Sequence, residues 1–523
     1  MQTIAYAFLP AFRLMVAAHG NIMKRVAIIG GGSTGWMTAA WLHAVLNAGG
    51  ANRVAIEVIE SPRIARIGVG EATVPSIRQF LSTIGIDEKS FLIAADATFK
   101  GAIKFDGWQG GDAPGYFHPF DRRALAVPDE AAQDWLTSDR GLPWADTVSA
   151  LAHLCTDGYA PKAPGWPDYG SSFPYAYHMD ADKFAQTLSA QAVRRGVTHT
   201  RDEITGAELD EDGYIKALHR LNGAPVTADL YLDCTGFAGV LIDKALGTGW
   251  VDYSPWLMCD RAIAMRVPHE VWYRGTIRPY TCATALSAGW AWDIGLINRR
   301  GIGYVYASAF IDDDAAEREL RALEGAHAQG LDARRLRFAA GHRQQFWKGN
   351  CIALGMAAGF VEPLESTALY LVQAAAAALC DYFPDQGRPA ALMAARFNAS
   401  MTALFEEILD FINLHYCLSR RHDTAFWQEV QRAEHTTPRL RERLRLWRHK
   451  PVSARDFDET LRLFSPQSYE FILYGMGYTP RAAKTGPAAR IPAQIQKIVT
   501  ASKAKFGTHE HCLRSITGAE IAP

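Results

Sequence analysis

The first clear pattern of hydrophobic and polar positions lies near the start of the chain, in RVAIIGGGSTGWMTAAWLHAVL. Val26 to Ile29 form a short continuous apolar run, which is typical of a buried parallel strand. The glycines of Gly30-x-Gly32-x-x-Gly35 follow, and then a segment rich in Ala and Leu with helical spacing. A second apolar run, RVAIEVIE, ends at Glu60. This order predicts a Rossmann-type dinucleotide-binding fold.

The predicted turn offers the groups that a cofactor diphosphate needs. The first glycine permits the tight turn, the second lets the backbone approach the pyrophosphate, and the third lets the helix pack on the strand. The helix start at Ser33 and Thr34 supplies N–H donors and the positive end of a helix dipole. Glu60 is placed to accept the ribose hydroxyls. The motif alone does not distinguish FAD from NAD(P).

Two later segments repeat the change from apolar strand to turn. Leu230 to Asp233 predict a strand that ends in the turn DCTG and leads into a helix. Cys351 to Leu354 predict another strand, followed by a Gly-rich turn and a long Ala- and Leu-rich helix. With the front unit, these segments predict an α/β fold of the FAD-dependent monooxygenase type. The sequence holds no second GxGxxG, so we expect no separate NADPH domain.

The chain divides into three predicted parts. Residues 1–22 are expected to be a tail, either outside the native protein or loosely docked, because IAYAFLPAF lacks a preceding basic region and Pro10 interrupts it. Residues 23–390 predict the FAD-binding core with an interleaved antiparallel substrate sheet, in which the aromatic stretch 107–168 forms irregular loops. Residues 391–523 predict a mostly helical part that covers the substrate site. Within it, PRLRERLRLWRHK predicts a basic amphipathic helix with a solvated face, or alternatively a membrane or partner helix.

Composition narrows the functional classes. The 523 residues are 49% hydrophobic and 21% charged, with a formal net charge of -1, which is typical of a soluble globular protein and gives no indication of a nucleic-acid partner. No run reaches the length of a membrane span, so we expect no stable membrane association. The eight cysteines form no CxxC pair, which predicts reduced thiols, no metal site and a cytoplasmic location.

Two tryptophans stand two positions apart in the segment GWAWDIGL. Alternate side chains of a strand point to the same face, so the rings of Trp290 and Trp292 are expected to lie together. They form either a wall beside a reactive cofactor or an ordinary aromatic core in an antiparallel sheet.

Several segments together resemble the flavin-dependent tryptophan halogenases over nearly the whole chain from Met23 to about residue 480. The segments are GGGSTGWMTAA, RIGVGEATVPSI (66–77), ATFKGAIKFDGW (97–108), GWAWDIG, GYVYASAF (303–310), FVEPLESTALY (360–370) and DFINLHYCLSRRHDTAFW (410–427). The combination of Lys100, the tryptophan pair and EPLEST is the specific part of this resemblance.

The resemblance implies a two-component enzyme. Reduced FAD, delivered by a separate NAD(P)H flavin reductase, would use oxygen to convert bromide or chloride into hypohalous acid. This oxidant would pass through a tunnel to Lys100, which would hydrogen-bond it or form a haloamine, and Glu365 would polarise it and take the ring proton. In each case a structural role is the alternative: a surface charge for Lys100 and a helix-start acid for Glu365. Glu362 is the neighbouring acid that the motif match does not select.

The resemblance also implies the remaining site residues. The halide site would be Ser366, Thr367 and Ala368, for which a helix N-cap is the alternative. His118 and Phe120 would lie on the substrate side or the tunnel with Trp290 and Trp292. The expected cofactor contacts are Gly30, Gly32, Ser33, Thr34, Gly35, Glu60, Ala72, Ile204, Met356 and Leu369.

Two departures from the family pattern bear on the substrate. The final Pro of the tryptophan motif is Gly295 here, which loosens the backbone locally. The segment FDETLRLFSPQSYEFILYG does not align with the family's clamp for the amino-acid group. We therefore expect indole or another electron-rich aromatic as substrate rather than free tryptophan. An FAD-dependent aromatic hydroxylase and a noncatalytic flavin-binding protein remain the alternatives, and a homodimer is possible.

Overall fold

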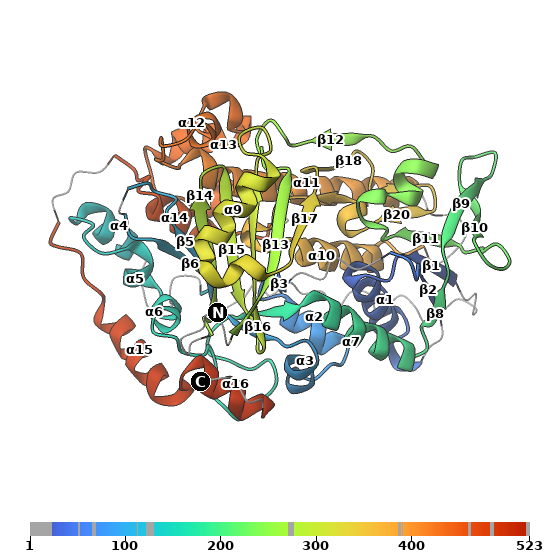
Figure 1. Ribbon diagram of the computed structural model, residues 1–523, viewed down its shortest axis with the longest axis horizontal. Helices are drawn as coiled ribbons and strands as arrows, with labels where there is room; N and C mark the ends of the chain where they lie inside the picture. Colours follow the sequence, from blue (N-terminus) through green and yellow to red (C-terminus); the bar gives the residue numbers. More distant parts are fainter. Residues whose placement is uncertain are drawn as a thin grey trace.

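The computed structural model describes residues 24–50, 53–64, 70–111, 113–121, 130–269, 277–384, 389, 391–458, 462–481 and 486–518. The predicted tail of residues 1–22, residues 66–69 of the segment RIGVGEATVPSI and the end of the chain lie outside this part. Figure 1 shows the sheet that contains residues 24–29 and 54–60 at one end of the molecule and the last two helices, α15 (Ala493–Phe506) and α16 (His509–Thr517), toward the other.

The front of the chain builds a six-stranded sheet in the order β19-β20-β11-β1-β2-β8. Its strands are β1 (Lys24–Ile29), β2 (Val54–Glu60), β8 (Thr198–Arg201), β11 (Leu230–Asp233), β19 (Trp347–Lys348) and β20 (Cys351–Ala353). All neighbours pair in parallel except β19 with β20. Helix α1 (Ser33–Leu46) follows β1 and packs on α7 (Ala181–Arg194) and α10 (Ala368–Asp381). The predicted Rossmann unit is therefore confirmed.

A second sheet of seven strands has the order β17-β13-β16-β15-β14-β5-β6. The strands are β5 (Ala102–Asp106), β6 (Tyr116–Pro119), β13 (Arg261–Pro268), β14 (Tyr280–Leu286), β15 (Gly289–Gly295), β16 (Arg299–Tyr306) and β17 (Ala333–Arg337). Every pair is antiparallel except β14 with β5. Helix α9 (Asp313–Glu324) packs against β16. This is the antiparallel sheet that the sequence predicts.

A small sheet, β3-β7-β4, joins the two larger ones. Strand β3 (Gly70–Ala72) pairs with β7 (Ala176–Asp180), contacts β15 and β16, and shares β7 with β4 (Thr98–Lys100). Lys100 is the last residue of β4. The remaining strands are β9 (Ile204–Leu209), β10 (Ile215–Arg220), β12 (Trp250–Asp252), β18 (Gly341–Arg343) and β21 (Gly359–Phe360).

Helices dominate after residue 390, as the sequence predicts. They are α11 (Ala391–Cys417), α12 (Ala425–Val430), α13 (Pro438–Trp447), α14 (Pro466–Gly475), α15 (Ala493–Phe506) and α16 (His509–Thr517). Helix α14 contacts β6, and buried side chains of α11 belong to the same hydrophobic cluster as those of β1 and α1. Helices α2 (Ile77–Thr83) and α3 (Glu88–Ala94) lie earlier in the chain.

One local prediction is wrong. The stretch 107–168 contains β6 and the helices α4 (Glu130–Thr137), α5 (Trp144–Val148) and α6 (Ala150–Thr156), because its aromatic and aliphatic side chains bury one face of each short helix. The helix predicted after β11 does occur, as a short 3-10 helix (Gly236–Ala238) and a six-residue π-helix (Val240–Ala245). Gly236 and Gly239, with φ of 65° and 48°, interrupt regular helix there.

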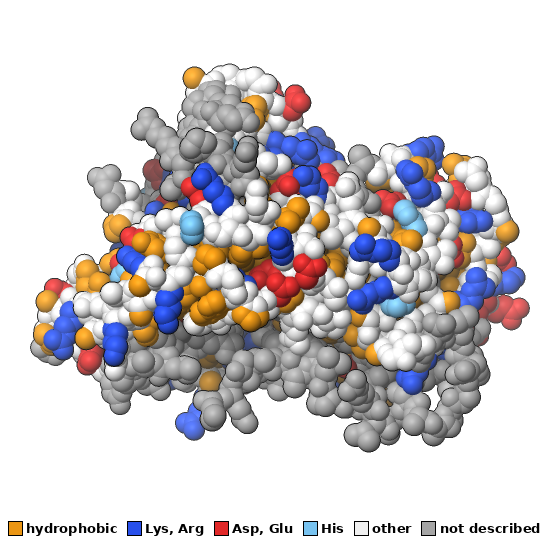
Figure 2. Space-filling model, turned by 90° about the horizontal axis from the view of Figure 1, so that it is seen from below, with side chains coloured by type: hydrophobic (Ala, Val, Ile, Leu, Met, Phe, Trp, Pro, Cys, Tyr) orange, Lys and Arg blue, Asp and Glu red, His pale blue; other side chains and the backbone are white. Residues whose placement is uncertain are grey.

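Charged side chains of both signs lie on the described surface of the molecule. On the face seen in Figure 2, basic and acidic side chains are interspersed. Among the described residues, no helix is long and apolar enough to cross a bilayer. Helix α13, which carries the basic segment, buries Leu440, Arg443 and Trp447 and exposes Arg445, whereas Arg439 binds the buried Asp410 at 2.5 Å.

Candidate active site

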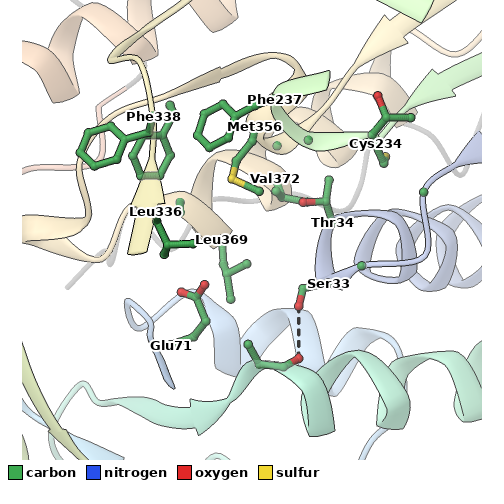
Figure 3. A pocket seen from close by; sticks show the side chains of 18 of the residues that line it. Ser33, Thr34, Glu71, Cys234, Phe237, Leu336, Phe338, Met356, Leu369 and Val372 are labelled. Atoms are coloured by element: carbon green, nitrogen blue, oxygen red, sulfur yellow. Dashed lines mark hydrogen bonds between the residues drawn. The ribbon is translucent and has the colours of Figure 1, made fainter. Parts of the chain in front are cut away.

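A cavity of about 540 Å³ lies between the six-stranded and seven-stranded sheets, within the size range of small-molecule sites (Figure 3). Its walls come from the turn after β1, the end of β2, β3, the turn after β11, β15, β17 and the start of α10. Nine of the expected cofactor residues line it: Gly30, Gly32, Ser33, Thr34, Glu60, Ala72, Ile204, Met356 and Leu369. Gly35 instead packs helix on strand, because a Cβ there would lie 1.9 Å from the carbonyl oxygen of Gly30.

One end of the cavity is a helix N-terminus without a side-chain cap. Gly32 is the N-cap of α1, makes no side-chain cap and has open space where a Cβ would point. Gly30 has a φ of +114°, and a Cβ there would lie 2.3 Å from the carbonyl oxygen of Cys234. Uncapped N–H groups and the dipole of α1 are therefore directed at open space, which fits a diphosphate.

The acid at the end of β2 lies beside the turn, as the sequence predicts. Glu60 Oε2 is 3.0 Å from His199 Nε2 of β8. A Cβ on Gly31 would lie 2.3 Å from the Glu60 carboxyl carbon, so the middle glycine of the GGG run lets the acid approach the turn. No role was predicted for Gly31, although it stands in the GGG run. The acid and the uncapped turn together fit the ribose and diphosphate of a dinucleotide.

The other end of the cavity is aromatic. Trp290 and Trp292 of β15 both line it, with ring centroids 6.4 Å apart and planes at 61°. Trp292 lies over Gly303 of β16, where a Cβ would come within 2.1 Å of the indole ring. The two rings therefore share one face of the sheet, and that face forms a wall of the cavity.

Gly295 does not interrupt this strand. It pairs with Arg300, and its carbonyl accepts a hydrogen bond of 2.5 Å from the Thr98 hydroxyl. A Cβ at Gly295 would lie 2.8 Å from Ile277 Cγ2, so the absence of a side chain permits close packing there.

The turn before α10 joins the cavity to a buried ammonium group. Ser366, with a φ of 60° in the left-handed region, and Ala368 both line the cavity. Ser366 Oγ accepts a hydrogen bond of 2.7 Å from Lys100 Nζ, which also donates to the Thr73 carbonyl at 3.2 Å. Thr367 is the N-cap residue but makes no side-chain cap, and its hydroxyl is buried without a partner in the described chain. The side-chain cap that was the alternative for Thr367 is therefore absent.

Lys100 is fully buried at the end of β4. Burial lowers the pKa of its ammonium group to about 7, although the negative charge of Glu365 favours the protonated form. The ammonium also lies 5.1 Å from the centre of the Phe120 ring. The surface-charge alternative for Lys100 is thus excluded.

Glu365 lies between two histidines. His118 Nδ1 of β6 is 3.0 and 3.1 Å from the two carboxylate oxygens, and His415 Nε2 of α11 is 3.0 Å from Oε1. Burial alone would raise the pKa of Glu365, but the charge and hydrogen bonds of His118 and His415 outweigh it and lower the pKa to about 2. Glu365 is therefore a carboxylate. His415 stands in DFINLHYC, which resembled the family, yet no role was predicted for it.

Glu362, the neighbouring acid, has a different environment. Its Oε1 accepts a hydrogen bond of 2.6 Å from Tyr416, and burial raises its pKa to about 7. It does not line the cavity.

Three phenylalanine rings pack around His118. Its ring centroid is 5.6 Å from that of Phe411, 6.3 Å from that of Phe464 and 6.1 Å from that of Phe471. These rings come from α11, the segment before α14 and α14 itself. Phe411 and Phe464 also stack on each other, with their ring centroids 3.7 Å apart, so that an aromatic cluster lies beside the His118–Glu365 pair.

The known proteins to which this chain is similar include tryptophan halogenases. The family described as tryptophan halogenase matches residues 25–491. Tryptophan 6-halogenase SttH from Streptomyces toxytricini is 34% identical over 507 residues, which cover 92% of this chain and 95% of that protein.

Solved structures agree with this sequence match. A tryptophan halogenase from Shewanella frigidimarina is 32% identical, with a TM-score of 0.87 over 95% of this chain and 98% of its own. BrvH, a flavin-dependent halogenase from Brevundimonas sp. BAL3, is also 32% identical, with a TM-score of 0.81 over 95% of this chain and 100% of its own. Both likenesses extend over the two sheets and the C-terminal helices.

Proposed function

The chain belongs to the tryptophan halogenase family, and from this premise we propose that Lys100 and Glu365 carry its halogenation chemistry. It is a flavin-dependent enzyme, and the reduced flavin comes from a separate reductase. The family likeness favours halogenation over the hydroxylase alternative. The observation that carries the proposal is the hydrogen bond of 2.7 Å between Lys100 and Ser366, a residue of the cavity wall.

The cavity between the sheets is the proposed FAD site. The uncapped start of α1 would hold the diphosphate, Glu60 the ribose, and the wall of Trp290 and Trp292 one side of the ring system. Reduced flavin bound there supplies, with oxygen, the two-electron oxidation of halide to hypohalous acid. The tryptophan wall would keep an aromatic substrate away from the cofactor, so that the substrate is not oxidised directly.

The turn Ser366–Ala368 is the proposed halide site. The unpartnered hydroxyl of Thr367 and the N–H groups at the start of α10 offer hydrogen bonds to an anion. Lys100 adds a nearby positive charge through Ser366. Bromide and chloride have the same charge and both remain candidates.

Lys100 is proposed to hold the hypohalous acid against the substrate. Its ammonium would hydrogen-bond the oxygen of this acid, so that the halogen becomes more electrophilic. The ring carbon would form the carbon–halogen bond as the oxygen–halogen bond breaks, and a proton from Lys100 would convert the leaving hydroxide into water. The haloamine alternative would need the neutral amine instead.

Glu365 is proposed to accept the ring proton. As a carboxylate between His118 and His415, it would stabilise the positive charge that develops on the ring and then remove the proton. Transfer of a proton back to Lys100 restores both groups, and the net products are the halogenated ring and water.

The proposed substrate is indole or a related electron-rich aromatic. Phe411, Phe464 and Phe471 around His118 provide flat apolar surfaces, which suit a ring without a charged side chain.

Product mass tests this assignment. The protein is incubated with indole, FAD, NADH, a flavin reductase and either bromide or chloride. Halogenated indole is expected, and the Lys100→Ala variant should form it at least about 100-fold more slowly. A product that gains oxygen instead of halogen would support the hydroxylase alternative, and undiminished halogenation by Lys100→Ala would remove that residue from the mechanism.

A further inference from the structure

The cavity between the two sheets is acidic for a site proposed to hold a dinucleotide with two phosphate charges. The charged residues that line its described part are Glu60, Glu71, Asp182, Asp202, Glu203 and Arg337. Five are therefore acids and one is a cation. Bringing an anionic ligand into such a cavity is unfavourable unless the acids are paired or neutral.

Four of these acids have basic neighbours. Glu60 lies 3.0 Å from His199 and Asp182 lies 3.4 Å from Arg266. The other two pairs are Asp202 with Arg220 at 3.6 Å and Glu203 with Arg63 at 2.6 Å. Glu71 differs, because no hydrogen bond or ion pair joins its carboxyl group to another residue in the described part of the chain.

The position of Glu71 directs its carboxyl group into the cavity. Strand β3 pairs Glu71 with Met179, and Figure 3 shows the side chain pointing toward Leu336 and Leu369. Burial raises the pKa of Glu71 to about 7, with no charged neighbour contributing to the shift. A ligand that fills this space would remove the remaining water from a carboxyl group that already has no partner.

Other titratable groups on the elements packed against β3 are engaged elsewhere. Opposite β3 on β7, Asp180 is bound by Arg299 at 2.7 Å, and His178 hydrogen-bonds to Thr281 at 2.9 Å with its pKa well below the usual value because of burial. On β16, Arg300 is bound by Asp293 and Glu324. The lone carboxyl of Glu71 is thus the group most sensitive to occupation of the cavity.

We infer that Glu71 takes up a proton when the flavin dinucleotide binds, so that cofactor binding weakens as the pH rises. The ligand shifts Glu71 toward its neutral form, because an ionised carboxylate enclosed with apolar ring surface and no partner is costly. By linkage, a group that binds more protons in the complex makes the affinity fall with pH. This inference rests on the proposed placement of FAD in the cavity.

Calorimetric titration of the full-length apoprotein with oxidised FAD tests it. Measurements at pH 6, 7 and 8, in buffers with different ionisation enthalpies, give both the Kd and the number of protons taken up. With a free-state pKa of about 7 for Glu71, the Kd should be about tenfold higher at pH 8 than at pH 6, with close to one proton bound per FAD at pH 8.

The Glu71→Gln variant should abolish this dependence and bind FAD more tightly than the wild type at pH 8. A gain in affinity cannot come from misfolding, so it is informative even if the variant is less stable. Glu203→Gln, which changes a paired acid of the same cavity, should keep the proton uptake of the wild type. FAD binding without proton uptake, or unchanged uptake in Glu71→Gln, would overturn the inference. No FAD binding to the wild type would overturn the cofactor placement itself.

Discussion

At the scale of single residues, the position of Lys100 is the most demanding feature of the site. A buried ammonium group is costly unless it is hydrogen-bonded, and Lys100 donates to both Ser366 and the Thr73 carbonyl. Its removal should lower the rate of halogenation by about 100-fold or more, the scale expected for loss of a proton-donating group. Lys104→Ala is the control, since that lysine is only partly buried and lies 3.0 Å from Asp106. Both rates are measured as halogenated indole per enzyme with FAD saturating.

The ionisation of Lys100 predicts the pH dependence of halogen transfer. Its pKa is lowered to about 7 by burial, so the ammonium form is lost as the pH rises through 7. If the ammonium holds the hypohalous acid, the transfer rate should be about tenfold lower at pH 8 than at pH 6. Single-turnover assays with pre-reduced enzyme at saturating FAD measure this step. A rate that rises with pH would instead indicate the haloamine, which needs the neutral amine.

The two acids of EPLEST should respond differently to the same substitution. Glu365→Gln removes a carboxylate that His118 and His415 keep ionised, and should reduce halogenation by about 100-fold or more. Glu362→Gln replaces an acid whose pKa is near 7 with an amide of the same shape, and should retain most of the activity. Product formation by both variants, with circular dichroism as a check on folding, provides the test. Equal losses would contradict the assignment of the base to Glu365 alone.

At the scale of elements, strands were predicted correctly from the sequence where a hydrophobic run is followed by a turn signal. The strand before the glycines, the strand ending at Glu60 and the strand Leu230–Asp233 all occur. Lys100, Ser366 and Trp290 are likewise found at or near the cavity, as the family motifs implied.

Elements whose form depends on distant packing were not predictable in this way. The short helices in 107–168 have weak local signals, and contacts with α14 and α15 stabilise them. His415 was missed for a related reason. Its contact with Glu365 depends on where α11 lies relative to the EPLEST turn, and no local spacing in the sequence reveals that arrangement. Gly31 and Glu71 acquire their importance only from the shape of the cavity.

Trp292 of strand β15 is expected to contribute to FAD binding, because its ring lines the cavity. Trp292→Ala should remove one wall of the cavity and weaken FAD binding by about tenfold, the effect of losing roughly 1.4 kcal/mol of aromatic contact. More oxygen should also be consumed per halogenated product. Trp292→Phe keeps a ring over Gly303 and serves as the matched control. The measurements are the Kd of FAD and the ratio of oxygen consumed to product, and wild-type values in Trp292→Ala would assign both tryptophans to the core alone.

At the scale of the whole molecule, the proposed site exists only where separate parts of the chain meet. Lys100 comes from the small joining sheet, His118 from the edge of the seven-stranded sheet, Glu365 from the turn before α10, and His415 from α11. Side chains from all of these regions belong to one hydrophobic cluster. The boundary at residue 390 remains a prediction, but the described core is continuous across it.

The aromatic rings around His118 predict which substrate the protein prefers. The region around His118 is closed by Phe411, Phe464 and Phe471, which offer ring surfaces and no charge. Free tryptophan would bring an ammonium and a carboxylate group against this aromatic surface, and burying either without a partner is costly. We therefore expect kcat/KM for indole to exceed that for free tryptophan by at least about tenfold. Parallel assays with each halide, using 3-methylindole as a control for the bulk of a substituent, measure this ratio. A preference for tryptophan over both neutral indoles would require charged partners for its amino-acid group and would contradict the substrate assignment while leaving Lys100 and Glu365 in place.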